Sequence, residues 1–249
     1  MKKALITGAS SGLGRELAYQ LSELGYELIL VARDKKGLEE TKKNCKTEAK
    51  IYICNLTKEE NVIKMYEENK NVDLLINNAG FGLFGYFHET DLQKELEMID
   101  VNIKALHILT KLYLKDFIKK DSGRILNVGS VAGFQAGPKL STYYSTKNYV
   151  VKQTLAISHE LKELNSNVKI SVLCPGPFNS KFNETAGAKF NSKNIESKEI
   201  AKYAIKKMFT NKIIIMPGLR WKTTTFMSRF MPYSILMKIT SNFQDKKQK

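Results

Sequence analysis

The sequence predicts an α/β fold: one doubly wound parallel sheet of about seven strands, with helices on both faces. Short apolar or β-branched runs recur along the chain, and stretches with helical spacing of apolar residues separate them. Most runs are continuously apolar rather than alternating, which is typical of parallel strands covered on both faces. A chain that alternates β and α segments folds into one such sheet. The expected strands span residues 4–7, 27–32, 51–54, 74–77, 124–128, 169–173 and 213–216.

A glycine-rich turn and a helix are expected directly after the first strand. Four leucines recur at the spacing of one helical face and a glycine then ends the pattern as a C-cap: Leu13, Leu17, Leu21, Leu24 and Gly25. The turn before them reads TGASSGLG, with Gly8, Gly12 and Gly14 in G-x-x-x-G-x-G spacing. Glycines let the chain approach a pyrophosphate, whose charge then meets the N–H groups of the helix N-terminus. A dinucleotide site is the functional interpretation, and a plain tight turn is the alternative.

The second strand ends in residues that bear on the choice of coenzyme. Arg33 and Asp34 follow it, where a nucleotide-binding sheet places the adenosine ribose. An acid there accepts bonds from ribose hydroxyls and favours NAD(H), whereas an arginine offers fixed donors to a 2′-phosphate and favours NADP(H). We favour NADP(H) through Arg33. NAD(H) stays open, because a small backbone shift could present Asp34 and because Arg33 could be a solvated surface residue.

The stretch from residue 92 to residue 119 is expected to be helical and apolar on two faces. A helix of this kind is either deeply buried or covered by a partner. The sequence therefore favours a homo-oligomer, a dimer or a tetramer. One stripe consists of Leu92, Leu96, Ile99 and Ile103, and the other of Met98, Val101, Ala105 and Ile108.

Composition argues for a soluble globular protein of the cytoplasm without a metal site. Of its 249 residues, 43% are hydrophobic and 26% are charged, and no apolar run is long enough to span a membrane. The apolar start is too short for a signal peptide. Neither the three cysteines nor the three histidines have the spacing of metal ligands, and reduced buried thiols are expected instead.

The formal net charge of +15 is the unusual total. It could indicate nucleic-acid binding, which predicts salt-sensitive association. The positive charge is nevertheless dispersed along the chain, so we expect no nucleic-acid partner.

Six motifs, the glycine-rich turn among them, together resemble the short-chain dehydrogenase/reductase family. They are TGASSGLG (7–14), NNAG (77–80), Asn102 in DVNIKAL, Ser130 in NVGSVAG, Tyr143 and Lys147 in YYSTK, and PGPFNS (175–180). The resemblance covers residues 1–218 and implies a single Rossmann-type domain that interconverts a carbonyl and an alcohol with a nicotinamide coenzyme. A Gly-, Asn- and Ser-rich stretch at about 177–196 is expected to form a substrate loop, and residues 219–249 a basic amphipathic extension.

Tyr143 and Lys147 have the spacing of an acid and its activating cation. Four residues apart on a helix, they lie on one face, whereas Tyr144 is rotated by about 100° from Tyr143 and is expected in a wall. A tyrosine ionises near pH 10, and a neighbouring ammonium lowers that pKa. The resemblance implies that Tyr143 is the acid, that Lys147 also binds the nicotinamide ribose, that Ser130 holds the substrate carbonyl, and that Asn102 positions a water linking Lys147 to solvent. The structural alternatives are a capping serine, a buried asparagine and a packed tyrosine.

The complete set of expected cofactor-binding residues combines the motifs with the positions that follow the second and third strands. They are Gly8, Ser10, Ser11, Gly12, Leu13, Gly14, Arg33, Asn55, Leu56, Asn78, Ala79, Gly80, Tyr143, Lys147, Pro175, Gly176, Phe178 and Ser180. Two positions depart from the family pattern. Asn55 stands where an aspartate usually contacts adenine, and Ser11 stands where NADP-preferring members often have a basic residue, which leaves Arg33, helped by Arg15, to bind the phosphate.

The substrate side is described only in general terms. Six phenylalanines are candidates for an apolar wall of a pocket for a ketone or aldehyde: Phe81, Phe84, Phe87, Phe134, Phe178 and Phe182. Residues 217–249 hold seven Lys and Arg and one Asp, interleaved with aromatic residues. This segment could pack on a neighbouring subunit, touch an anionic membrane or guard the substrate mouth. The alternative is a cofactor-sensing or scaffold protein that keeps the fold but not the catalysis. Such a chain would be expected to have another residue in place of Ser130, Tyr143 or Lys147, and all three are present.

Overall fold

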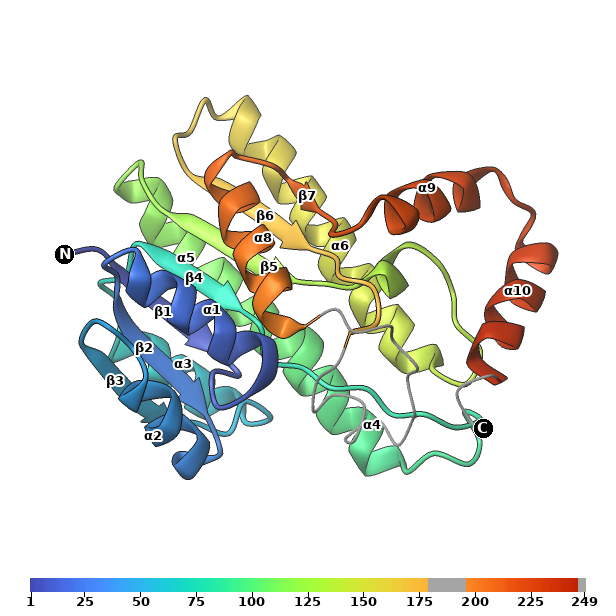
Figure 1. Cartoon of the computed structure of the whole chain (residues 1–249), viewed down its shortest axis with the longest axis horizontal. Helices are drawn as coiled ribbons and strands as arrows, with labels where there is room; N and C mark the ends of the chain where they lie inside the picture. The colour runs from blue at the N-terminus through green and yellow to red at the C-terminus, as the bar shows by residue number, and fades with distance from the viewer. Residues whose placement is uncertain (179–195, 246–249) are drawn as a thin grey trace.

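The computed structural model describes residues 1–178 and 196–245. Within these ranges seven parallel strands form one sheet in the order β3-β2-β1-β4-β5-β6-β7 (Figure 1). All seven expected strands are confirmed, each within two residues of its expected bounds. The strands are β1 (Lys3–Thr7), β2 (Glu27–Ala32), β3 (Ala49–Ile53), β4 (Leu74–Asn77), β5 (Arg124–Val128), β6 (Lys169–Leu173) and β7 (Ile214–Ile215).

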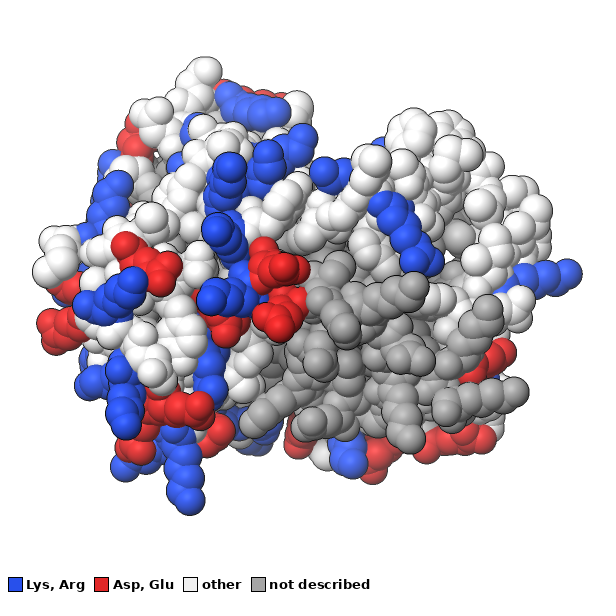
Figure 2. Space-filling model, viewed as in Figure 1, with Lys and Arg blue, Asp and Glu red and all other residues white. Residues whose placement is uncertain are grey.

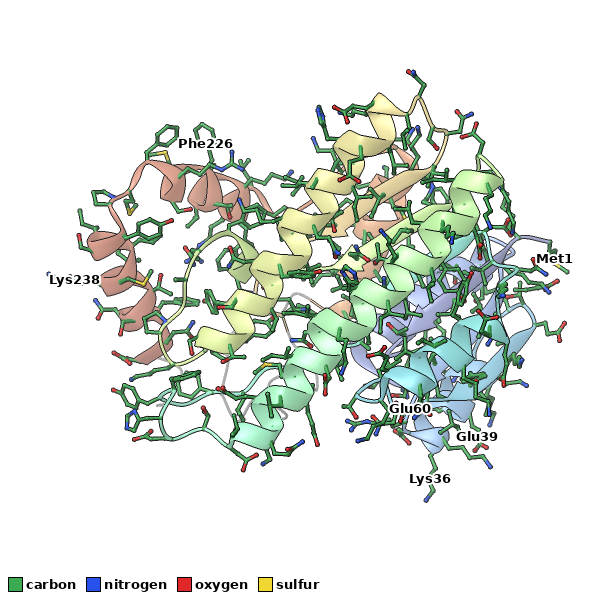
Figure 3. The ribbon with its side chains drawn as sticks, turned by 180° about the vertical axis from the view of Figure 1, so that it is seen from behind. Met1, Lys36, Glu39, Glu60, Phe226 and Lys238 are labelled. Atoms are coloured by element: carbon green, nitrogen blue, oxygen red, sulfur yellow. The ribbon has the colours of Figure 1, made fainter. Side chains whose placement is uncertain are left out.

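Helices cover both faces of the sheet, which explains why the strands are apolar throughout. One face carries α1 (Gly12–Glu23), α2 (Lys35–Lys43) and α8 (Ser197–Phe209), and a buried core lies beneath them (Figure 1). The other face carries α3 (Glu59–Glu67), α5 (Leu106–Lys119) and α6 (Ser141–Glu163), over a second core (Figure 3). This is the doubly wound arrangement that the sequence predicts.

The first helix begins and ends as expected. Leu13, Leu17 and Leu21 are buried against the sheet, whereas Leu24 lies at the end of the helix and is exposed. Gly25 has φ +81°, a left-handed conformation that glycine adopts without steric cost.

The helical stretch from residue 92 is divided rather than continuous. It consists of α4 (Leu92–Ile99), a π-helical segment η1 (Asp100–Ala105) and then α5. The stripe that contains Met98 and Ala105 packs into the core, whereas Leu92 and Leu96 of the other stripe are exposed. The two predicted faces are therefore distinct, and one of them has no cover within the described chain.

After the last strand the chain forms two helices that stand at one side of the sheet (Figure 1). These are α9 (Leu219–Met227), which continues into a short 3-10 turn η3 (Ser228–Phe230), and α10 (Tyr233–Asp245). Gln244 donates a hydrogen bond of 2.8 Å from Nε2 to the hydroxyl of Tyr144, and Lys139 pairs with Asp245. These contacts tie the end of α10 to α6 and to the segment before it. No helix of the described residues is long and apolar enough to cross a membrane.

Candidate active site

A cavity of about 810 Å³ lies at the carboxyl ends of β1, β4, β5 and β6. Ligands of open α/β sheets bind at this edge, where the strand order reverses beside the first strand. The structure brings nearly all predicted site residues to the cavity wall. They are Gly8, Ser10, Ser11, Gly12, Leu13, Gly14, Arg33, Asn55, Leu56, Asn78, Ala79, Gly80, Ser130, Tyr143, Lys147, Pro175, Gly176 and Phe178. Asn102 lies behind the wall, and Ser180 and most of the predicted substrate loop lie outside the described residues.

The turn before α1 is built to receive an anion. Ser11 is the N-cap residue, yet its side chain makes no capping hydrogen bond, and the first turn of α1 holds no acidic residue. By contrast, Asp34 and Asp91 cap α2 and α4 with their carboxylates. The N–H groups of α1 are thus left for a ligand, and the helix dipole favours a negative one. A dinucleotide pyrophosphate fits this turn.

Close packing explains why the turn needs glycine. Gly8 has φ +68°, and a Cβ there would lie 2.8 Å from the side-chain nitrogen of Asn78. A Cβ on Gly14 would overlap the carbonyl oxygen of Gly8. Any larger residue at these two positions would therefore displace the turn from its packing against the NNAG segment.

Thr7 joins the turn to the NNAG segment, and sequence reasoning missed it. Its hydroxyl accepts hydrogen bonds of 3.0 Å from the N–H groups of both Asn78 and Ala79. The Asn78 amide in turn donates to the carbonyl oxygen of Thr7 at 2.9 Å. A hydroxyl at the last position of a buried strand was the available signal, because such a group needs polar partners.

Arg33 is the available cation at the end of β2. It is exposed, lines the cavity and has no hydrogen bond or ion pair among the described residues. Asp34 is engaged, because its carboxylate accepts from the N–H of Gly37 at 3.1 Å. The expected help from Arg15 is not seen, since both terminal nitrogens of that guanidinium bind Glu40 at 2.8 Å.

Asn55 lines the cavity where the adenine contact is expected. Its Oδ1 accepts from the N–H of Thr57 at 3.2 Å and from its hydroxyl at 3.0 Å. The side chain thereby closes a local turn after β3, and its NH₂ group, which has no partner in the part of the chain that the structure describes, can donate to a ligand.

Ser130, Tyr143 and Lys147 meet at the bottom of the cavity, although they come from different elements. Ser130 follows β5, and its Oγ accepts from the N–H of Ala132 at 3.1 Å, which starts the short 3-10 turn η2 (Val131–Phe134). Burial raises the pKa of Tyr143, and a hydrogen bond with the Ser130 hydroxyl acts in the opposite direction. Tyr143 is consequently protonated at neutral pH in the free protein and can donate a proton.

Lys147 is a buried cation beside this pair. Its side chain is buried, and its Nζ donates a hydrogen bond of 2.9 Å to the carbonyl oxygen of Val128. The same Nζ lies 5.9 Å from the ring centre of Tyr143. Desolvation lowers the pKa of Lys147 to about 8, so the ammonium still predominates at neutral pH. Burial also raises the pKa of the neighbouring Cys174 thiol to about 12, which leaves that group neutral.

Asn102 lies in the π-helical segment and fixes two parts of the site relative to each other. Its Oδ1 accepts from the N–H of Phe81 at 3.1 Å, while its Nδ2 donates to the Phe81 carbonyl at 2.9 Å and to the Thr146 hydroxyl at 3.1 Å. The side chain thus connects the loop after β4 to α6 next to Lys147. π-Helical segments inside α-helices frequently occur at functional sites.

Tyr144 and part of the predicted phenylalanine set form an apolar wall. Tyr144 lines the cavity and packs edge to face on Tyr143, with 6.2 Å between the ring centres. Phe81 and Phe178 also line the cavity, and Phe84 packs beside the two tyrosines. Phe87 is instead exposed, Phe134 packs in a separate core cluster, and Phe182 lies outside the described residues.

The C-terminal helices line the same cavity, where one of the three roles that the sequence left open for this segment, a guard of the substrate mouth, would place them. Trp221 lies directly on Gly176, where a Cβ would overlap the indole. Leu236, Ile239 and Phe243 of α10 line the same cavity. Their helical spacing was visible in the sequence, but it did not decide between this role and contact with a subunit or a membrane.

Comparisons with known proteins agree with this geometry. A family model described as short chain dehydrogenase matches residues 2–191. An uncharacterized oxidoreductase of Staphylococcus epidermidis is 32% identical over 206 residues, which are 80% of this chain and 87% of that protein. Estradiol 17-beta-dehydrogenase 11 of Rattus norvegicus is 30% identical over 86% of this chain and 74% of its own length.

Two solved structures share the fold. A short-chain dehydrogenase from Sphingobium yanoikuyae in complex with NADPH has a TM-score of 0.82 at 25% identity, over 92% of this chain and 94% of the other. A short-chain dehydrogenase/reductase from Burkholderia phymatum in complex with NAD has a TM-score of 0.82 at 22% identity, over 90% and 91% of the two chains. The protein therefore belongs to the short-chain dehydrogenase/reductase family, and it is an oxidoreductase that uses a nicotinamide cofactor.

Proposed function

We propose that the protein is an NADPH-dependent reductase of a ketone or aldehyde, with Tyr143 as the proton donor. The observation that carries the proposal is the hydrogen-bonded pair of Ser130 and Tyr143 beside the enclosed ammonium of Lys147. These groups lie in the cavity whose other end is the uncapped N-terminus of α1. One cavity thus offers sites for a pyrophosphate and for a reacting carbonyl.

The residues of the site divide the chemistry between them. The bound coenzyme would supply the hydride that reduces the carbonyl carbon. Ser130 donates a hydrogen bond to the carbonyl oxygen, and Tyr143 transfers its phenolic proton to that oxygen as negative charge develops there, which yields the alcohol. The Lys147 ammonium stabilises the phenolate that remains on Tyr143. Asn102 acts as a positioning residue, because protein partners occupy its side-chain amide.

Preference for NADPH rests on Arg33. Its guanidinium is not engaged with any described residue, whereas the Asp34 carboxylate that would favour NADH caps α2. Arginine binds phosphate through a fixed fork of charge-assisted donors. The apolar wall of Phe81, Phe178 and Tyr144 suits a substrate with a sizeable hydrocarbon part.

A pair of tyrosine variants tests the mechanism. Tyr143→Phe removes the proton donor and is expected to lower kcat by about 10²–10⁴-fold, the usual share of general acid catalysis. Binding of NADPH, followed by its fluorescence, should change little. Tyr144→Phe is the matched control: it loses the hydrogen bond from Gln244 and should retain turnover.

The assay is a panel of ketones, aldehydes, sterols and β-ketoacyl esters with NADPH and NADH in parallel, monitored by absorbance of the reduced nicotinamide. Full turnover by Tyr143→Phe would refute the assigned acid. Tight NADPH binding by the wild type without oxidation of the coenzyme by any carbonyl would favour a cofactor-sensing protein instead.

We also propose that the chain assembles as a homo-oligomer through the exposed stripe of α4. Leu92, Leu96 and Ile99 are 71%, 45% and 38% exposed and lie on one helical face. Light scattering should then give a mass of two or four chains.

A further inference from the structure

The outer face of the C-terminal helices carries a row of exposed apolar side chains. We call Leu219, Phe226, Met227, Phe230 and Tyr233 the outer stripe; they are between 56% and 78% exposed. The rings of Phe226 and Phe230 pack edge to face, with 5.4 Å between their centres. Figure 3 shows Phe226 pointing away from the body of the protein. A contiguous apolar surface of this kind usually marks an interaction site.

The outer stripe is not part of the cavity wall, because α9 lines the cavity with its opposite face. Trp221, Thr224 and Ser228 recur at helical spacing and line the cavity. Leu219, Phe226 and Phe230 lie about half a turn away around the helix axis. One face of this segment thus lines the cavity, and the opposite face exposes aromatic rings to solvent.

Positive charge surrounds the outer stripe. Arg220, Lys222, Arg229 and Lys238 are exposed, and residues 217–244 contain no acidic side chain. Figure 2 shows the same contrast: the part of the surface over α9 and α10 is mostly uncharged with blue side chains, whereas the body of the protein mixes both signs. Lys238 points outward from α10 (Figure 3). The nearest acid along the chain, Asp245, is paired with Lys139.

We propose that the outer stripe docks the protein onto the surface of a bilayer that contains anionic lipids. Aromatic and aliphatic side chains enter the headgroup region, while lysine and arginine at its border attract the lipid phosphates. The positive charge around the outer stripe favours an anionic bilayer over a second copy of the chain as the binding partner. A symmetric contact through the stripe would bring two all-basic surfaces together without acidic partners, which is repulsive.

Docking in this way would place the cavity next to the bilayer. The same two helices carry the stripe outside and the apolar lining of Trp221, Leu236 and Phe243 inside. A lipophilic carbonyl compound could then reach the site from the membrane. This consequence rests on the proposed reductase function, whereas the docking does not.

Vesicle binding tests the proposal with the full-length protein. Phosphatidylglycerol vesicles and phosphatidylcholine vesicles are compared by flotation, with NADPH binding as the check on folding. The wild type is expected to float with the anionic vesicles and much less with the neutral ones. Each basic residue near an anionic surface strengthens binding by about fivefold, so Lys222→Glu/Arg229→Glu should weaken it by about 25-fold or more. Phe226→Ser/Phe230→Ser should also lose binding.

Matched variants elsewhere on the surface give the control. Lys42→Glu/Lys43→Glu makes the same change in net charge on α2, and Leu24→Ser/Leu164→Ser removes two exposed apolar side chains outside the segment. Both should float like the wild type. No flotation of the wild type, or equal losses in the control variants, would overturn the proposal. So would a change of mass in light scattering for Phe226→Ser/Phe230→Ser without a change in flotation, because the occupant would then be a second copy. An inactive protein that still floats would contradict only the reductase assignment.

Discussion

Replacement of Lys147 by methionine is expected to stabilise the protein while it abolishes turnover. Lys147 is only 5% exposed, and among the described residues its ammonium makes a single hydrogen bond, to the Val128 carbonyl. No carboxylate is among the groups that influence its pKa. A buried charge without a counterion destabilises a fold, so its presence here is explained by the chemistry of the site rather than by stability.

The size of the effect follows from the pKa of Lys147. A decrease from the ordinary 10.5 to about 8 corresponds to about 3 kcal/mol of unfavourable free energy for the charged folded state. Methionine removes this cost and fills a similar volume, but it leaves the Val128 carbonyl without its donor, a loss of about 1–2 kcal/mol. The net gain is about 1–2 kcal/mol, or about 2–8 °C in Tm for a chain of this size.

The pH dependence has a definite sign. Below pH 8 Lys147 is protonated in both states, so the destabilisation of the wild type is fully present. Between pH 8 and pH 10.5 the folded state has released this proton while the unfolded chain keeps it, and the wild type therefore gains stability as pH rises. The advantage of Lys147→Met should be largest at pH 7 and should shrink toward pH 10.

Urea unfolding at pH 7 and at pH 9.5, without coenzyme, measures this difference. Lys152→Met is the control, because Lys152 lies exposed on the same helix and its loss should change the free energy of unfolding by less than about 0.5 kcal/mol. A Lys147→Met variant that is less stable than the wild type at pH 7, or whose advantage does not depend on pH, would refute the reasoning.

Two further variants probe a residue of the cavity wall and a residue behind it. Arg33→Ser should raise the KM for NADPH by about 10- to 100-fold and leave that for NADH nearly unchanged, because only the 2′-phosphate loses charged donors; equal losses for both coenzymes would contradict the assignment. Asn102→Ala should lower the free energy of unfolding by about 2–4 kcal/mol in urea titrations, since it leaves the Phe81 N–H and carbonyl without partners and removes the bond that the Thr146 hydroxyl accepts. Unchanged stability would show that water replaces the amide.

Local pattern was sufficient for the sheet and for much of the site. Continuously apolar runs mark strands that are covered on both faces, and all seven strands formed where such runs occur. Parallel strands present their carboxyl ends at one edge, so the residues that follow β1, β4, β5 and β6 had to gather there. The spacing of Tyr143 and Lys147 was also sufficient to place them on one face of α6, since the face that a helical residue occupies depends only on its position along the chain.

Contacts between distant segments were decided by the tertiary structure alone. Nothing near Arg15 in the sequence indicated that Glu40 would engage it, and nothing near Tyr144 indicated a hydrogen bond from Gln244, one hundred residues away. Likewise, the amphipathic pattern of α9 showed that one face would be covered but not that Trp221 would lie on Gly176. The spacing of apolar residues predicts which side chains are buried, because buried positions are mostly apolar. The partner that buries it depends on how whole elements pack, and that information is spread over the entire chain.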